Sequence, residues 1–227
     1  MKLVCDRRET LAILEQCRKA GVALFAPNGE LPAEIEGLCM GAQAFAHAHG
    51  LGQVPIAIGM TGIYADNPQF RKMSIDCRIA EDVSGLSGGD VRQGCEIWLR
   101  HLACYQDLGD TFPAVRVLPF IDHGWAPDPE DREMLADPSV VERMAFIMYD
   151  ASKYNHEENI RRTGAFAAAL PNRHPVSVLP FHAAGGEKYK RLGQSYTLGE
   201  LGPPEEQRIA GVARLLEAYD LEVRIGG

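Results

Sequence analysis

The sequence predicts an α/β protein with a TIM-barrel-like parallel sheet that is incomplete or composite. Short apolar runs typical of strands alternate with amphipathic stretches typical of helices along most of the 227 residues. The strand candidates are apolar throughout, which favours parallel strands covered by helices. About six strands are expected, fewer than the eight of a complete barrel.

The first part of the chain contains two helix–strand pairs and then a long polar stretch. Helices are expected at 9–20 and 32–49, where apolar residues recur at helical spacing. The apolar runs at 22–26 and 54–59 are the first two expected strands. The pattern weakens between 60 and 88, and loops of that length are usually functional or mobile.

The middle of the chain continues the alternation with clearer signals. A helix is expected at 90–108, followed by strands at 114–121 and 145–149. Asn155 and Glu158 stand three residues apart, a capping-box spacing that predicts the start of the next helix.

The last part of the chain is expected to add two strands and a helix. The strands lie at 176–181 and 221–225, and Pro204 opens the helix at a position that tolerates its missing N–H donor. A break between the two parts predicts domains at 1–172 and 173–227, with the second possibly packed on the same barrel as the first.

Composition restricts the partners that the chain is expected to have. The 23 Lys and Arg against 31 Asp and Glu give a net charge of −8, which disfavours a nucleic-acid partner. We expect no membrane contact and a cytoplasmic location, because the sequence has no apolar run of about 18 residues and no secretory signal pattern. The six cysteines form no Cys-x-x-Cys pair and are expected to be reduced. A homo-oligomer in which two chains complement each other stays open.

The strongest chemical pattern is the pair Asp122–His123 before Gly124, at the end of the third expected strand. Loops converge at the carboxyl ends of parallel strands, and sites form there. A neutral imidazole can bind a divalent metal, while a neighbouring carboxylate can transfer a proton. The structural alternative stays open, in which Asp122 caps a loop and His123 is half exposed.

A second segment, "DASKYNHEENIRRT", begins at Asp150, where the fourth expected strand ends. Together with "IDHG" it resembles the class II, metal-dependent ketose-bisphosphate aldolases, over about residues 9–170. The resemblance implies a lyase that carries out reversible aldol cleavage of a phosphorylated ketose. It implies Asp122 as the catalytic proton-transferring residue and His123 as a ligand of a divalent metal, namely zinc. Asp150 and Ser152 would line the substrate pocket, with helix-entry capping as an equal alternative.

The tail, residues 175–227, resembles a different family. "LPFH", then "GEKYKRLGQSY" and a proline-led helix are similar to the C-terminal end of glycyl-radical-enzyme activating enzymes of the radical S-adenosylmethionine class. That family binds an iron–sulfur cluster through Cys-x-x-x-Cys-x-x-Cys, a spacing that this sequence lacks. His182 lies at a strand end in the tail and is a second candidate metal ligand.

Three functions follow from these patterns, and they leave open whether the chain is an enzyme. The leading one is an aldolase-like lyase that acts on a small sugar phosphate. The alternative is a catalytically degenerate barrel that binds a small phosphorylated ligand or a protein partner. The third is a remnant of a glycyl-radical-enzyme activase without its cluster motif.

Overall fold

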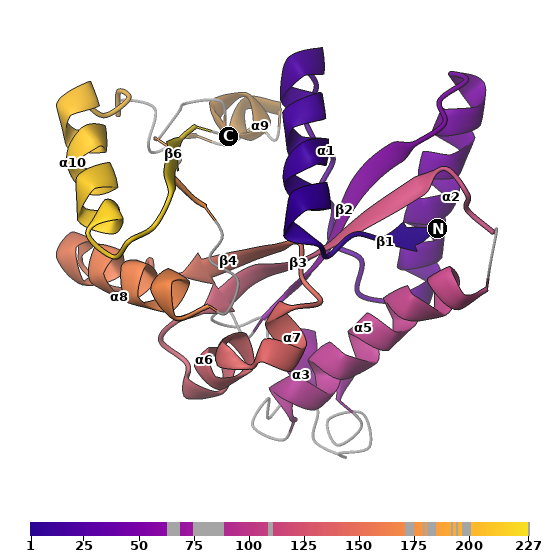
Figure 1. The fold of residues 1–227 in the computed structure, drawn as a ribbon, viewed down its shortest axis with the longest axis horizontal. Helices are drawn as coiled ribbons and strands as arrows, with labels where there is room; N and C mark the ends of the chain where they lie inside the picture. The colour runs from indigo at the N-terminus through magenta and orange to yellow at the C-terminus, as the bar shows by residue number, and fades with distance from the viewer. Residues whose placement is uncertain are drawn as a thin grey trace. The chain divides into compact units, whose positions relative to one another are not determined.

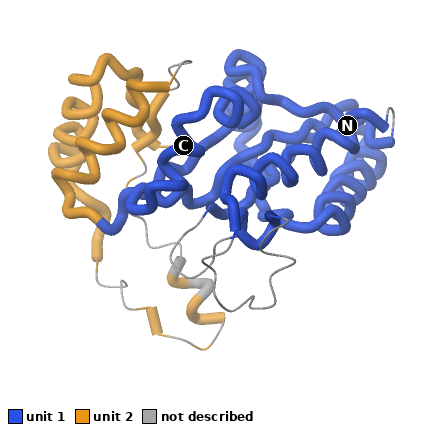
Figure 2. Tube along the Cα trace, turned by 90° about the horizontal axis from the view of Figure 1, so that it is seen from below, with its two compact units in different colours: residues 1–153 blue, residues 154–227 orange. Residues whose placement is uncertain are grey.

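The computed structural model describes residues 1–62, 69–74, 89–108, 111–170, 175–178, 180, 185–191, 193, 195–196 and 201–226. The chain forms two compact units, Met1–Lys153 and Tyr154–Gly227, which are coloured separately in Figure 2. Each unit is considered by itself below.

The first unit is built on a parallel four-stranded sheet with β3 (Val115–Trp125) at its centre. β2 (Val54–Thr61) pairs along one side of β3. The short β1 (Lys2–Leu3) pairs with the start of β3, and β4 (Phe146–Asp150) pairs with its end. Figure 1 shows β2, β3 and β4 side by side, so that their carboxyl ends meet at one edge of the sheet.

Six helices belong to the described part of this unit: α1 (Arg7–Ala20), α2 (Pro32–Ala48), α3 (Gln69–Met73), α5 (Val91–Asp107), α6 (Pro129–Ala136) and α7 (Pro138–Val141). Capping residues fix the ends of several of these helices. The Asp6 carboxylate accepts the Glu9 N–H at the start of α1, and Gly21 adopts φ 65° at its end. Asp90 caps α5 in the same way by accepting the Gln93 N–H at 2.9 Å.

Apolar residues are buried on both faces of the four-stranded sheet. On one face Ile58, Met60 and Ile121 are fully buried, and α2 and α3 pack against β2. The other face holds a small cluster around Ala57 and Leu118, on which Ile13 of α1 packs. Burial on both faces explains why the strands read as apolar throughout.

The second unit is smaller. Its elements are α8 (His156–Ala169), β5 (Val176–Val178), α9 (Gly185–Arg191), α10 (Glu206–Glu217) and β6 (Val223–Ile225). β5 and β6 form a two-stranded parallel sheet, and α10 packs against α8 and both strands. The expected cap is confirmed, because Asn155 Oδ1 accepts the Glu158 N–H at 3.0 Å.

The α/β class with parallel strands is confirmed, while the barrel is not: the strands of the described residues form two separate sheets, and no closed barrel is seen among them. The structure has no strand over the expected range 22–26. Instead, the Phe25 carbonyl and the residues that follow it pair with β2. The domains 1–172 and 173–227 stay a prediction. Within the described ranges, no helix has the length and apolar character needed to cross a membrane.

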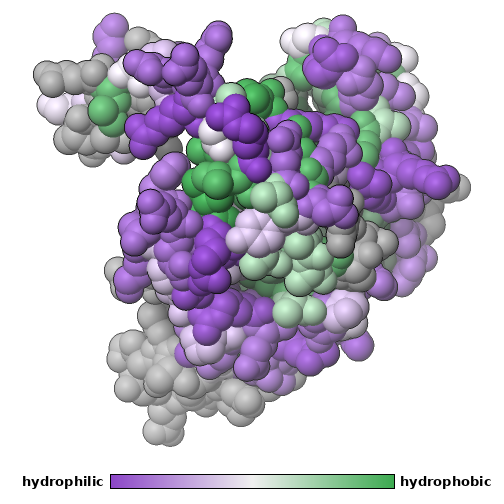
Figure 3. Space-filling view, turned by 60° about the vertical axis from the view of Figure 1, so that its left-hand side comes forward, coloured by the Kyte–Doolittle hydropathy of each residue, from purple (hydrophilic) through white to green (hydrophobic). Residues whose placement is uncertain are grey.

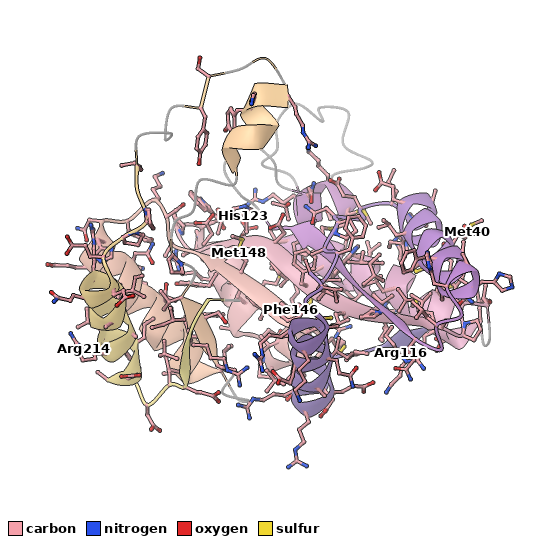
Figure 4. The ribbon with its side chains drawn as sticks, turned by 90° about the horizontal axis from the view of Figure 1, so that it is seen from above. Met40, Arg116, His123, Phe146, Met148 and Arg214 are labelled. Carbon is pink, nitrogen blue, oxygen red and sulfur yellow. The ribbon has the colours of Figure 1, made fainter. Side chains whose placement is uncertain are left out.

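Both polar and apolar side chains reach the surface. Figure 3 shows hydrophobic residues gathered between hydrophilic ones on one face of the molecule. Four of the residues labelled in Figure 4 lie on strands of the first unit: Arg116 and His123 on β3, and Phe146 and Met148 on β4. His123 therefore marks the carboxyl end of the sheet.

Candidate active site at the carboxyl ends of the strands

An irregularity near the end of β3 turns the strand at Asp122 and His123. The pairing with β4 shifts register between Ile121 and Gly124. His123 has φ 54°, a left-handed conformation that is uncommon for a residue other than glycine. Bulges of this kind redirect side chains and occur often beside active sites. Here the turn brings the His123 ring to Asp150 of the neighbouring strand.

A short contact joins His123 and Asp150 at the centre of the site. The Nδ1 of His123 lies 2.6 Å from Oδ2 of Asp150, whose side chain is only 7% exposed. The other carboxylate oxygen accepts the Ser152 N–H at 2.9 Å. Burial alone would raise the pKa of Asp150, but the hydrogen bonds from Ser152 and His123 outweigh it and lower that pKa. Asp150 is therefore ionised at neutral pH.

The ionised carboxylate decides which nitrogen of His123 carries the proton. A carboxylate only accepts hydrogen bonds, so Nδ1 must donate to it. In the neutral ring, Nε2 is then the acceptor. The arrangement can hold an imidazole in one orientation and one tautomer, as a general base requires.

Asp122 is held beside the ring by residues from two other segments. Its Oδ2 accepts a hydrogen bond from Asn28 Nδ2 at 2.9 Å, and the same amide nitrogen lies 3.3 Å from Thr61 Oγ1. Its Oδ1 lies 3.9 Å from Nε2 of His123. Thr61 is the residue opposite Asp122 in the β2–β3 register, so the end of β2 supports the end of β3.

A further polar pair extends this network. Gln69 Oε1 accepts the Thr61 N–H at 2.7 Å, and Gln69 Nε2 donates to Glu30. Burial and the nearby Glu34 carboxylate raise the pKa of Glu30. The two contacts connect the end of β2 with α3 and with the segment that precedes α2.

The structure thus brings together four of the residues predicted from the sequence: Asp122, His123, Asp150 and Ser152. Their roles stay predictions, and Ser152 also supports the capping alternative, because its N–H binds Asp150. His182 lies outside the described residues. Sequence reasoning missed Asn28 and Thr61, although the strand-end rule could have found Thr61, which ends β2.

Comparisons with known proteins point to one class. No family model matches the chain. It is 35% identical over 66 residues to the pyruvate formate-lyase-activating enzyme of Listeria monocytogenes (29% of this chain, 27% of the relative). Over 56 residues it is 38% identical to the trans-4-hydroxy-L-proline dehydratase activating enzyme of Clostridioides difficile (25% and 18%). Over 67 residues it is 28% identical to the pyruvate formate-lyase 1-activating enzyme of Escherichia coli (30% and 27%). The chain spans about a quarter or less of these relatives' length.

One solved structure aligns with nearly the whole chain, at low similarity. It is a domain of the pyruvate-formate lyase-activating enzyme from Bacteroides vulgatus, at 14% identity, with 99% of this chain and 98% of that one covered. The TM-score is 0.25, so this likeness carries no argument about the fold.

The aldolase reading is wrong. The relatives described above are activating enzymes and not class II aldolases or zinc-dependent lyases. The described residues contain no group of three or more His, Cys, Asp or Glu suited to a metal ion, so zinc at His123 is wrong too. The sugar-phosphate partner was inferred from the aldolase resemblance, so it has no support either. The misleading motifs are short, and their Asp and Asn residues serve strand-end and capping contacts that any parallel α/β protein needs.

The iron–sulfur cluster implied by the second resemblance does not fit the residues present. Cluster ligands are thiolates, and burial raises the pKa of Cys95 to about 12 and that of Cys39 to about 11. Burial also raises the pKa of Cys5 to about 11. These thiols stay protonated at neutral pH, and the 227 residues contain no Cys-x-x-x-Cys-x-x-Cys spacing. No chemical step of this chain is therefore derived through a cluster.

Proposed function

We propose that this chain is a partner-binding relative of glycyl-radical-enzyme activating enzymes, which binds a glycyl-radical enzyme without itself generating the radical. The observation that carries the proposal is the likeness of 56 to 67 residues to activating enzymes from several organisms. The names of these relatives state that they act on a protein, pyruvate formate-lyase or trans-4-hydroxy-L-proline dehydratase. We infer that the likeness includes the tail at 175–227, which carries the activase-like pattern.

The surface of the second unit supports a protein partner. Tyr189 of α9 is 39% exposed, and its ring lies 5.1 Å from that of Tyr196, centroid to centroid. Leu201, Leu215 and Ile225 are also exposed. Exposed tyrosines and large apolar side chains are typical of the residues that dominate protein interfaces.

Binding to a purified pyruvate formate-lyase, measured by biolayer interferometry, tests the proposal. We expect saturable binding that Tyr189→Ala weakens about tenfold or more, the loss expected when an interface aromatic is truncated. Phe45→Ala is the matched control, because Phe45 is an exposed aromatic residue of α2 in the first unit. No binding at micromolar concentration, or equal losses in both variants, would contradict the proposal.

A second measurement separates binding from activation. The chain, incubated with iron, sulfide, S-adenosylmethionine and a reductant, is added to the pyruvate formate-lyase, and the mixture is examined by electron paramagnetic resonance. We expect no glycyl-radical signal, because the cysteines do not fit a cluster. A radical signal would show that the chain activates its partner by itself.

A further inference from the structure

We propose that α2 is the contact surface of a symmetric dimer of this chain, in which the α2 helices of two copies pack antiparallel. The evidence is the exposed face of this helix, its spacing of large and small side chains, and its charges. The inference concerns a helix of the first unit and is independent of partner binding through the tail.

Helix α2 is apolar on its exposed face as well as on its buried one. Ile35, Cys39 and Ala46 are buried where the helix packs against β2, β3 and α5. On the outer face, Met40 and Phe45 are 56% and 52% exposed, and Figure 4 labels Met40 on this helix. The outer face of a surface helix is ordinarily polar, whereas a helix that is apolar all round is ordinarily buried. We therefore expect another surface to cover this face.

Small residues fill the outer face between these two large side chains. Gly37, Gly41, Ala44 and Ala48 recur there at helical spacing, and all four are exposed. A Cβ at Gly37 or at Gly41 would meet nothing within 4 Å. The distance between the axes of two packed helices depends on the side chains at the contact, so this strip permits a second helix to approach closely.

The spacing of large and small residues is self-complementary. Phe45 and Gly37 each stand four residues from Gly41, which is about 6 Å along the helix axis. If two copies pack antiparallel with Gly41 at the two-fold axis, Phe45 of each copy lies level with Gly37 of the other. A large side chain then meets a position that has none. A parallel pairing in the same register would place Phe45 level with Phe45.

The charges of α2 favour a second copy in the same orientation. The chain has a net charge of −8, so two copies repel each other unless their contact surface is uncharged or complementary. The sequence has no Asp, Glu, Lys or Arg between Gly37 and Ala48. Glu36 precedes this stretch, and His47 and His49 stand at its other end. Antiparallel packing therefore places the carboxylate of one copy near the imidazoles of the other, at the rim of the contact.

The size of the contact sets its expected strength. Helix α2 has 17 residues and is about 25 Å long. A single pair of such helices buries less surface than most stable complexes do. The dimer is therefore reversible, with a dissociation constant in the micromolar range.

Sedimentation velocity of the purified chain between about 1 and 100 µM tests the dimer. Met40→Glu places a carboxylate of each copy in an apolar contact, and we expect it to raise the dissociation constant about tenfold or more. Met148→Glu is the matched control, because Met148 of β4 is an exposed methionine (49%) away from α2. A wild-type chain that stays monomeric, or equal weakening in both variants, would overturn the proposal.

Cysteine cross-linking tests the antiparallel geometry and gives a second variant if Met40→Glu fails to fold. A disulfide forms only when the two Cα atoms lie within about 7 Å. Gly41→Cys places its two copies at the two-fold axis, whereas Ala48→Cys places them about 20 Å apart. We expect disulfide-linked dimers from Gly41→Cys only, above the background of the wild type, in which Cys104 is exposed. Equal cross-linking of the two variants would overturn the antiparallel arrangement.

A last measurement distinguishes a second copy from a different protein on α2. Binding of Met40→Glu to pyruvate formate-lyase is compared with that of the wild type by biolayer interferometry, after circular dichroism has shown that the variant is folded. We expect unchanged binding, because the partner is proposed to bind the tail. A monomeric wild type together with weaker binding of Met40→Glu would assign the face to pyruvate formate-lyase and overturn the dimer.

Discussion

The two units organise their polar side chains in different ways. In the first unit, residues far apart in the sequence meet at the strand ends: Asn28 binds Asp122, and His123 binds Asp150. In the second unit, the described ion pairs are local, as where Glu158 of α8 binds Arg161 and Arg162 within one helical turn. Parallel strands that end side by side bring polar residues from distant segments together and so can form a site. Ion pairs along one exposed helix add only modest local stability.

The cores of the two units differ as well. The first unit buries large side chains completely, including Trp98 and Phe70, whose rings meet edge to face at 6.1 Å. Among the described residues of the second unit, the buried apolar side chains are Ile160, Ala167, Ala213, Leu216 and Leu221. We therefore expect the second unit to be the less stable of the two.

The largest predicted effect is the loss of stability when a large side chain is removed from the core of either unit. Trp98→Ala should cost about 3–5 kcal/mol and Leu216→Ala about 2–5 kcal/mol, the ranges for large-to-small core changes. Trp98 also donates a hydrogen bond to the Gly29 carbonyl at 2.9 Å, so its loss falls at the upper end. Urea unfolding is followed by circular dichroism and by tryptophan fluorescence, since both tryptophans, Trp98 and Trp125, lie in the first unit.

We expect Leu216→Ala to shift only the circular dichroism transition, and Trp98→Ala to shift the fluorescence transition as well. If Leu216→Ala moves the fluorescence transition just as far, the two units unfold as one body and the comparison fails.

A smaller effect tests the packing inside the second unit. A Cβ at Gly164 of α8 would lie 2.6 Å from ring atoms of Tyr219, while a Cβ at Gly211 of α10 would meet nothing within 4 Å. Gly164→Ala should destabilise the unit by about 1–3 kcal/mol through overpacking. Gly211→Ala should stabilise it by about 0.5–1 kcal/mol, because alanine favours a helix more than glycine does. Thermal unfolding of both variants checks the opposite signs; stabilisation by Gly164→Ala would mean that Tyr219 moves aside freely.

The smallest predicted effect concerns acid stability of the first unit. The pKa of Asp150 is lower in the folded protein than its ordinary value of 3.8. Its ionised form therefore contributes stability above about pH 4, and this contribution is lost as the pH falls through the lowered pKa. Asp150→Asn should show a flatter decline of the free energy of unfolding below pH 4 than the wild type.

The measurement is the urea midpoint of the fluorescence transition between pH 7 and pH 3. Asp107→Asn, at the exposed end of α5, controls for the loss of one carboxylate. Parallel curves for wild type and Asp150→Asn would show that the ionised Asp150 carboxylate, with its contacts to Ser152 and His123, contributes nothing to stability.

Much of the local structure of the first unit was predictable. The apolar runs at 54–59, 114–121 and 145–149 correspond to β2, β3 and β4, because a buried parallel strand must be apolar on both faces. The strand expected at 22–26 was misplaced by a few residues. In that segment the pairing with β2 continues to Asn28 and Gly29, beyond the apolar run itself.

The function was predicted less well, for a physical reason. The motifs at Asp122 and at Asp150 suggested an aldolase because strand-end acids and helix caps recur wherever a parallel strand passes into a loop and a helix. Such motifs define local backbone contacts, and they do not define a reaction. The resemblance of the tail to activating enzymes rested on a longer pattern, and the relatives that the comparisons found belong to that class.

The sequence by itself determined the strands β2, β3 and β4 and the long helices α1, α2, α5 and α8, and it placed Asp122, His123 and Asp150 at strand ends. Only the tertiary structure decided that His123 binds Asp150, 27 residues further on, and that Asn28 binds Asp122, 94 residues away. Those contacts depend on the register between neighbouring strands and on the irregularity after Ile121, which turns His123 into a left-handed conformation. Periodicity and capping are local properties of a chain, whereas hydrogen bonds between strand ends exist only once the sheet has formed.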